Sequence, residues 1–242
     1  MNGEGAGAHD RGAPRLGTPR VHRRVTGSTS ADARALAAAG APHGTLVTAA
    51  EQRDGRGRQG RRWHAPPGRA LLCSLVLREP PALLPIAAAV AVAALAGPDA
   101  ALKWPNDVQL GARKVAGILV EGRPQEGWAV LGIGVNVAVA LEELPPELRE
   151  SAGTLGLSPD ALEPALARLL ALLQDWLARP DAEIVDAWRA RDALLGHAIE
   201  WDGGRGIARG IDERGHLRVL REDGRTELLW AGEVHLAAPS RR

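Results

Sequence analysis

Cysteine and two of the three aromatic residue types are scarce or missing in this sequence. The chain has 242 residues, with a single cysteine, Cys73, and no tyrosine or phenylalanine. One cysteine excludes an intrachain disulfide and favours a reducing compartment. A chain of this length buries enough apolar surface to fold without a disulfide or a structural metal.

An excess of charge and a long hydrophobic run are missing as well. The formal net charge is +1, so no overall field attracts nucleic acid. The longest apolar run, Leu83 to Ala96, is too short to span a bilayer, and the N-terminus has no signal-peptide pattern. The seven histidines show no metal-ligand spacing. We therefore expect a soluble, cytoplasmic protein.

The sequence does contain a regular succession of strand and helix patterns. Strands are predicted over 20–26, 44–52, 69–78, 101–104, 107–122 and 127–137, and the fifth of these segments is a hairpin that turns at Gly111. Helices are predicted over 28–40, 82–96, 161–178 and 181–194. After about residue 196, short strands alternate with Gly-rich turns, which is typical of a small all-β module.

The domain organisation follows from these patterns. Residues 1–18 contain mainly glycine, alanine and charged residues without an apolar period, and we expect them to be disordered. Residues 19–194 form the main α/β domain, and residues 195–242 form the small β domain. No helix-turn-helix fits before the first structured segment, which argues against a DNA-reading domain there.

One basic segment, GRGRQGRRW at residues 55–63, has three interpretations. The Gly-x-Gly-x-x-Gly pattern of a dinucleotide site needs a helix after its last glycine, and Pro66 and Pro67 exclude a regular one. A nucleic-acid surface needs more aromatic residues than the one tryptophan present here. A plain solvated loop rarely needs so much glycine. A flexible lid over a phosphate-bearing ligand therefore fits best.

A second segment, LKWPNDVQLGARKVAGILVEG at residues 102–122, indicates the kind of ligand. Lys103 alone is typical of a solvated strand edge. Lys114 lies beside a strand that reads as buried, where an unpaired ammonium is costly. It therefore suits a carboxylate or phosphate partner.

Together these segments resemble biotin–protein ligases, also called biotin–[acetyl-CoA-carboxylase] ligases, of the class without the N-terminal DNA-binding domain. In chain order, the matching pieces are Ser28-Thr29, GRGRQGRRW, KWPND, RKVAGILVE, GIGVNV and GEVHL. The family usually has Ser-Thr-Asn where this chain has a serine at position 30. The resemblance implies an α/β (α+β) fold, with a mixed-sheet biotin/ATP-binding catalytic domain over 19–194 and a small Src-homology-3-like β-barrel over 195–242.

The resemblance also implies a reaction and a biotin site. Family members join biotin to ATP, release pyrophosphate, and transfer the biotinyl group from biotinyl-5′-adenylate to a lysine of a biotin carboxyl carrier domain. The ureido ring has two N–H donors and one carbonyl, which hydroxyl and amide groups satisfy. The implied biotin-binding residues are Ser28, Thr29, Ser30, Gln52, Arg56, Gly57, Arg58, Lys114 and Gly117.

The residues on the nucleotide side are implied in the same way. They are Arg56, Arg58, Trp63, Asn106, Lys114 and Asn136. Lys114, Arg56 and Arg58 offset the repulsion between the biotin carboxylate and the α-phosphate, and Asp107 orients or deprotonates the incoming lysine. Mg²⁺ would bridge the ATP phosphates with few protein ligands. Because biotinyl-adenylate hydrolyses in water, the lid hypothesis predicts that residues 55–65 are mobile without ligand and ordered around the intermediate.

The expected partner is the carrier domain of an acyl-CoA carboxylase. The segment VEGRPQEGWAVLGIG reads as an exposed sheet edge, where the carrier could dock by strand addition and a homodimer could use the same edge. A lipoate–protein ligase is the alternative enzyme, but lipoate lacks the ureido group. A nucleic-acid-binding protein that uses the Arg-Gly segment is the alternative of another class, disfavoured by the near-zero net charge.

Overall fold

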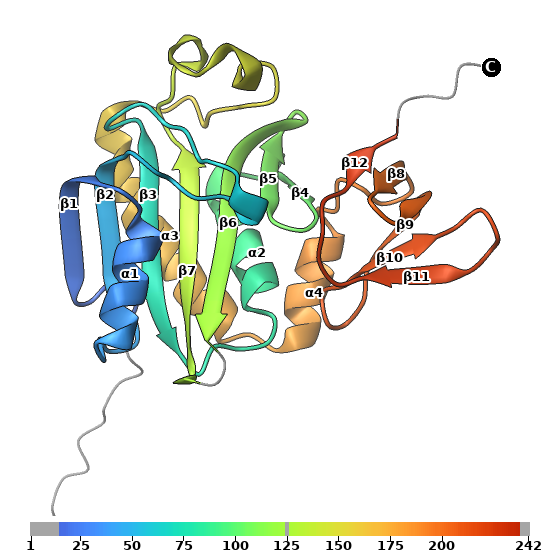
Figure 1. Cartoon of the computed structure of the whole chain (residues 1–242), viewed down its shortest axis with the longest axis horizontal. Coiled ribbons are helices and arrows are strands. Elements are labelled where there is room, and N and C mark those ends of the chain that lie inside the picture. The colour runs from blue at the N-terminus through green and yellow to red at the C-terminus, as the bar shows by residue number, and fades with distance from the viewer. Residues whose placement is uncertain (1–14, 124–125, 238–242) are drawn as a thin grey trace, which may run out of the picture.

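A computed structural model describes residues 15–123 and 126–237 of the chain. Most of the strands lie in one mixed sheet with the order β1-β2-β3-β7-β6-β5-β4 (Figure 1). The strands are β1 (Arg20–Thr26), β2 (Leu46–Gln52), β3 (Ala70–Arg78), β4 (Ala101–Lys103), β5 (Asp107–Leu110), β6 (Arg113–Arg123) and β7 (Trp128–Asn136). Only β1 and β2 pair in parallel, and the other neighbours are antiparallel.

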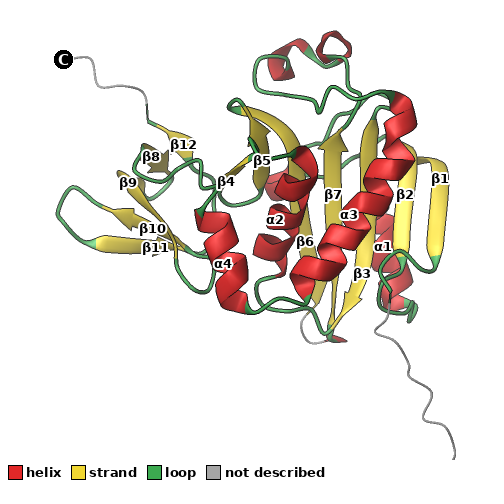
Figure 2. Cartoon of the chain, turned by 180° about the vertical axis from the view of Figure 1, so that it is seen from behind, coloured by secondary structure: helices red, strands yellow, loops and turns green. Residues whose placement is uncertain are grey.

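The two faces of this sheet are covered differently. Figure 2 shows the helices α2 (Leu84–Ala96), α3 (Leu162–Leu177) and α4 (Asp181–Arg189) on one face. The almost entirely apolar α2 is buried there, because it packs against the sheet and against both α3 and α4. Of the described α-helices, α1 (Thr29–Ala38) alone covers the other face, where it buries Ala33 and Ala37 against the strands. One half of that face is therefore left for loops, and the cavity described below lies under them.

The C-terminal part of the chain forms a second, antiparallel sheet with the order β11-β10-β9-β8-β12. Its strands are β8 (Ala198–Trp201), β9 (Gly204–Ile211), β10 (Leu217–Leu220), β11 (Thr226–Leu229) and β12 (His235–Leu236). The β9–β10 turn packs on the main domain, where the buried Trp104 donates its Nε1–H to the Gly215 carbonyl at 3.0 Å. Arg189 of α4 also donates to the Ile211 carbonyl.

The fold class predicted from the sequence is confirmed, and the mixed sheet with a following small β domain is present. The predicted helix over 181–194 is too long, since α4 ends at Arg189. There the chain turns to pair with β4 through bonds from Leu102 N to Arg191 O and from Ala193 N to Leu102 O. The Asp192 carboxylate accepts the Leu194 N–H and fixes this turn.

The N-terminal boundary also needs correction. Disorder was expected for residues 1–18, and residues 1–14 of that segment lie outside the described residues. From residue 15 the chain is part of the fold, because Leu16 is buried in the main core and its N–H donates to Gln174 of α3. Within the described residues, no helix is both long and apolar enough to cross a membrane.

Candidate functional site

A cavity of about 440 Å³ lies on the open half of the sheet, within the size range of small-molecule sites. Its floor is formed by β6 and β7, and its roof by the segment between β2 and β3. Gly117 and Gly134 face each other across these two strands. A side chain at Gly134 would collide with the Trp63 ring and one at Gly117 would crowd it, because the ring lies directly over the pair. The two glycines therefore let an aromatic ring rest on the sheet.

One end of the cavity contains neutral polar groups. The first turn of α1 supplies Thr29 and Ser30, and the end of β2 supplies Gln52. Thr29 donates its backbone N–H and its hydroxyl to Gln52 Oε1, at 2.7 and 3.0 Å. The hydroxyls of Thr29 and Ser30 also contact the hydroxyl of Ser74 on β3, which is fully buried beneath them. This end suits a compact polar ring that carries both donors and acceptors.

The other end of the cavity carries an ion pair. Lys114 Nζ lies 2.6 Å from Asp107 Oδ1, and both side chains are partly exposed to the cavity. The strands β5 and β6 lose their regular register between Val108 and Gln109, and this bulge lets Lys114 share a face with Gly117, three residues further on. A lysine held by one carboxylate can turn to an incoming anion at little cost.

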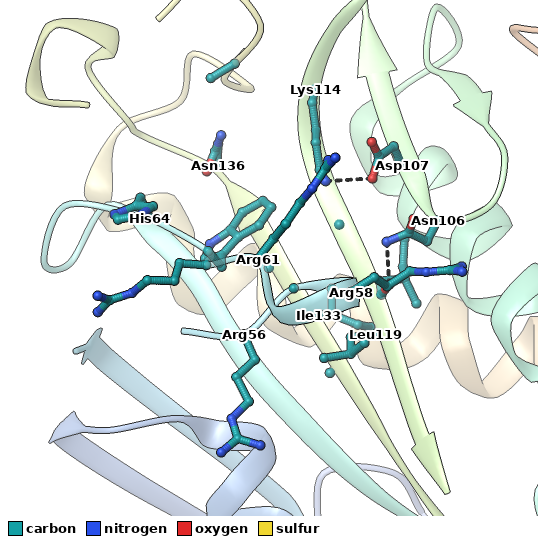
Figure 3. Close-up of a pocket in the computed structure, with 18 of the residues that line it drawn as sticks. Arg56, Arg58, Arg61, His64, Asn106, Asp107, Lys114, Leu119, Ile133 and Asn136 are labelled. Carbon is teal, nitrogen blue, oxygen red and sulfur yellow. Dashed lines mark hydrogen bonds and ion pairs between the residues drawn. The ribbon is translucent and has the colours of Figure 1, made fainter. Parts of the chain in front are cut away.

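Figure 3 shows this pair beside the neighbouring Asn106, whose amide donates to the Ile118 carbonyl at 2.9 Å. Asn136, at the end of β7, donates to the Gly153 carbonyl at 2.8 Å. Its Oδ1 is buried and has no hydrogen-bond partner among the described residues. Because a buried carbonyl without a partner is costly, Asn136 Oδ1 is a ready acceptor for a ligand N–H.

The Arg-Gly segment folds back on itself over the cavity. Arg56 and Arg62 form an antiparallel bridge, and Gly57 N donates to Arg61 O at 2.8 Å. The turn is closed by Gln59 and Gly60, both at positive φ. In Figure 1 the segment crosses the sheet from β2 towards β6, and its residues line the cavity from above the sheet.

The arginines of this segment are not equivalent. Figure 3 shows the Arg56 side chain extending away from the Lys114–Asp107 pair. Burial lowers the pKa of Arg58, and the nearby Glu233 and Asp107 offset this only in part. Arg61 forms an ion pair with Glu233. Arg58 is thus a partly desolvated cation that a bound phosphate would stabilise.

Sequence reasoning missed two contributions to the cavity. The loop over 138–157 supplies Leu144, Leu148, Ser151 and Ala152, and the β12 region supplies Glu233 and His235. The loop is tied to Lys114 by the bonds from Lys114 N to Ser151 O and from Gly153 N to Lys114 O. The signal in the sequence that could have identified this loop is its leucines, because leucine is unexpected in a loop that is fully solvated.

The predicted site residues do come together, with one exception. Thr29, Ser30, Gln52, Arg56, Gly57, Arg58, Trp63, Asn106, Asp107, Lys114, Gly117 and Asn136 all line the cavity. Ser28 does not, because its hydroxyl faces the start of α1 and accepts the Ala31 N–H as the helix N-cap. Ser28 therefore lies outside the cavity lining, its N-cap role explains its place in the motif, and its contact with biotin stays a prediction.

The predicted sheet edge also needs correction. The segment from Val120 to Gly134 spans β6 and β7, and β7 is interior because it pairs with β3 on one side and β6 on the other. The strand β5 covers β6 only as far as Gly117. Past the bond from Ile118 N to Asn106 O, β6 pairs with β7 alone among the described residues. The open stretch is thus the second half of β6.

Comparisons with known proteins identify the class of enzyme to which this fold and cavity belong. The model of the "Biotin/lipoate A/B protein ligase family" matches residues 23–137. The biotin--[acetyl-CoA-carboxylase] ligase of Mycobacterium tuberculosis is 36% identical over 86% of this chain and 85% of its own length. The ligase of the same name from Paracoccus denitrificans is 39% identical over 86% of this chain and 97% of its own length.

A solved structure agrees with these relatives. The biotin protein ligase from Aquifex aeolicus, in complex with biotin and ATP, superposes with a TM-score of 0.78 and 26% identity. The match covers 91% of this chain and all (100%) of that one. The chain therefore belongs to the biotin protein ligase family.

Proposed function

We propose that this chain activates biotin with ATP and transfers it to a lysine of the carrier domain of acetyl-CoA carboxylase. The carboxylate of biotin attacks the α-phosphorus, pyrophosphate leaves, and biotinyl-5′-adenylate forms. The ε-amine of the carrier lysine then attacks the biotinyl carbonyl, and AMP leaves as the amide forms. The observation that carries this proposal is that one cavity has neutral hydrogen-bonding groups at one end and the Lys114–Asp107 ion pair at the other.

The geometry supports a specific orientation of biotin. The ureido ring fits the end lined by Thr29, Ser30 and Gln52, where it finds hydroxyl and amide partners. The carboxylate then lies near Lys114, which offsets its repulsion from the α-phosphate. When Lys114 turns to the phosphate, Asp107 loses its partner and can accept a hydrogen bond or a proton from the incoming lysine.

The nucleotide fits the region under the 138–157 loop. Leu144, Leu148 and Trp63 belong to one apolar cluster there, and such a wall suits the flat faces of adenine. Asn136 Oδ1 can accept an N–H from the base. Arg58, already half-buried, is placed to pair with the α-phosphate.

The cavity fits Mg²⁺ carried by ATP better than a protein-bound ion. Its carboxylates, Asp107 and Glu233, are each paired with a cation. No three His, Cys, Asp or Glu side chains converge on a metal position within residues 15–123 and 126–237. When bound, Mg²⁺ would neutralise charge on the phosphates, with water as most of its remaining ligands.

One assay tests the proposed function. The protein is incubated with ATP, Mg²⁺ and either biotin or lipoate, and pyrophosphate release and label on a carrier domain are measured. We expect both signals with biotin and neither with lipoate, because the ureido groups have no counterpart in lipoate. Activity with lipoate alone would establish the sister reaction instead. Salt-dependent DNA binding without biotin-stimulated pyrophosphate release would support the nucleic-acid alternative.

A further inference from the structure

The hydroxyl groups beneath the neutral end of the cavity form a continuous chain. It runs from Gln52 Oε1 to Thr29 Oγ1 at 3.0 Å, on to Ser74 Oγ at 2.8 Å, and then to Ser30 Oγ at 3.1 Å. Ser74 lies outside the cavity lining and is fully buried. A hydroxyl has only one hydrogen to donate, so the direction of one bond determines the direction of the next.

The chain has one fixed end, which is the backbone N–H of Thr29. This group can only donate, so the atom of the Gln52 amide that lies 2.7 Å from it must be the oxygen. The Thr29 hydroxyl lies 3.0 Å from the same oxygen and must donate to it as well. The Gln52 amide group is thereby oriented with its NH₂ on the side away from Thr29.

The remaining directions follow one after another. Because the hydrogen of Thr29 is already used, Ser74 must be the donor in the contact between their hydroxyls. Ser30 must then be the donor in its contact with Ser74. Ser30 therefore reaches the cavity with lone pairs only and acts there as an acceptor. Gly132 makes this arrangement possible, since a side chain there would lie 2.6 Å from Ser30 Oγ.

We propose that Ser74 is a positioning residue that makes Ser30 an obligate hydrogen-bond acceptor, so that the site selects a ligand with an N–H at this position. This inference rests on the proposed function, in which the ligand is a cyclic urea. The urea N–H donates to Ser30, and the NH₂ of Gln52 remains available for an acceptor on the ligand. In a ring with oxygen in place of that N–H, the ring oxygen and Ser30 Oγ would both be acceptors and could not form a hydrogen bond.

The test uses biotin and its two cyclic carbamate analogues, in each of which one ring N–H is replaced by oxygen. Pyrophosphate release gives KM and kcat for each ligand. We expect Ser74→Ala to raise the KM for biotin about fivefold, because Ser30 is no longer pre-oriented. Since the freed Ser30 hydroxyl can now donate, we expect the preference for biotin over one carbamate isomer to fall about tenfold. The kcat and the KM for ATP should stay unchanged.

Two further variants separate this role from a general structural one. In a Ser30→Ala background, adding Ser74→Ala should change neither the KM for biotin nor the preference. Thr48→Ala removes another buried hydroxyl, one on β2 that contacts Arg20 and His22 outside the cavity, and should leave both unchanged. The proposal is overturned if Ser74→Ala keeps the wild-type preference, or if it acts equally in the Ser30→Ala background. Absence of pyrophosphate release by the wild-type protein would instead refute the proposed function.

Discussion

At the scale of single residues, the position of Lys114 is the most consequential feature of the cavity. It and Lys103 are the two lysines of the sequence, and both line the cavity. Lys114 is the one that forms an ion pair with Asp107 and lies 5.7 Å from the centre of the Trp63 ring. We propose that these contacts hold it at the point where the biotin carboxylate and the α-phosphate meet.

Replacing Lys114 tests its role directly. Lys114→Ala should lower the rate of biotin-dependent pyrophosphate release by about 10²–10³-fold, because a cation aimed at the developing charge is removed. Lys103→Ala is the matched control and should have a much smaller effect. Retained adenylation in Lys114→Ala would transfer this role to another residue.

The buried thiol gives a second prediction at this scale. Burial raises the pKa of Cys73 to about 12, so the thiol stays neutral at pH 8 and the reactive thiolate is nearly absent. We expect iodoacetamide to leave Cys73 unmodified at pH 8 and to label it once urea unfolds the protein, as measured by mass spectrometry. Rapid labelling of the folded protein would contradict this burial.

At the scale of elements, the Arg-Gly segment combines a tight turn with contacts to a distant part of the chain. Arg61 pairs with Glu233, and Arg58 donates to the Gly232 carbonyl at 3.4 Å. The cover over the cavity is thus held from the C-terminal domain as well as from β2 and β3. Its mobility without ligand stays a prediction, and unequal protease protection at Arg56–Arg62 with and without biotinyl-adenylate would support it.

A prediction about retention of the intermediate belongs to this segment. Arg56→Gly should release biotinyl-adenylate and label bystander lysines, because the lid loses a cation. Arg58→Gly should do so more strongly, since Arg58 is the more desolvated arginine and lies near Asp107. Mass spectrometry of an added bystander protein measures the labelling. Labelling confined to the carrier in both variants would refute the lid hypothesis.

The open stretch of β6 is the second element with a testable role. By strand alternation from Ile118, the backbone groups of Val120 and Gly122 point away from β7, and among the described residues they have no strand partner, so an added strand could pair with them. Glu121, which pairs with Arg34 at 2.9 Å, lies between them. We propose this stretch as the docking edge for the carrier, and it is also available to a homodimer.

Charge reversal tests this docking edge. The variant with Glu121→Lys and Arg123→Glu should slow transfer to the carrier while leaving pyrophosphate release unchanged, because the cavity is not altered. Reversal at Asp175 and Arg179, an exposed pair on and just after α3, is the matched control. Transfer at the wild-type rate in the β6 variant would argue against docking here.

At the scale of the whole molecule, Trp104 links the two sheets. It is 3% exposed, its indole N–H donates to the Gly215 carbonyl, and the cavity residues Asn106 and Asp107 follow it closely in sequence. A side chain at Gly215 would collide with Ile86 of α2, so the β9–β10 turn fits tightly against the main domain. Docking of the small domain therefore supports the turn that leads into Asp107, the first residue of β5.

Trp104→Phe tests this link. It keeps a large ring but removes the donor to Gly215, so the free energy of unfolding should fall by about 1–3 kcal/mol. Urea denaturation measures the change, with the midpoint lowered and the slope unaltered. Trp176→Phe, at a partly buried ring that packs on Arg179, should cost less. Equal losses in the free energy of unfolding in the two variants would show that the hydrogen bond to Gly215 does not stabilise the protein more than an ordinary ring contact.

The local periodicity of the sequence was enough to predict most elements. The strand pattern over 20–26 and the hairpin turn at Gly111 correspond to β1 and to the β5–β6 connection. Where the prediction was wrong, a contact distant in sequence had intervened. Leu16 is buried by α3, and α4 is cut short because residues 191–193 pair with β4.

The sequence by itself determined the fold class, the family resemblance, and the residue types that a biotin and ATP site needs, because these depend on short motifs and on apolar spacing. Tertiary structure alone decided that a register shift turns Lys114 onto the face of Gly117, that Ser74 lies under Thr29 and Ser30, and that Glu233 reaches the Arg-Gly segment. These relations join residues far apart in the chain or depend on one irregular strand pairing. Local sequence patterns carry no information about either.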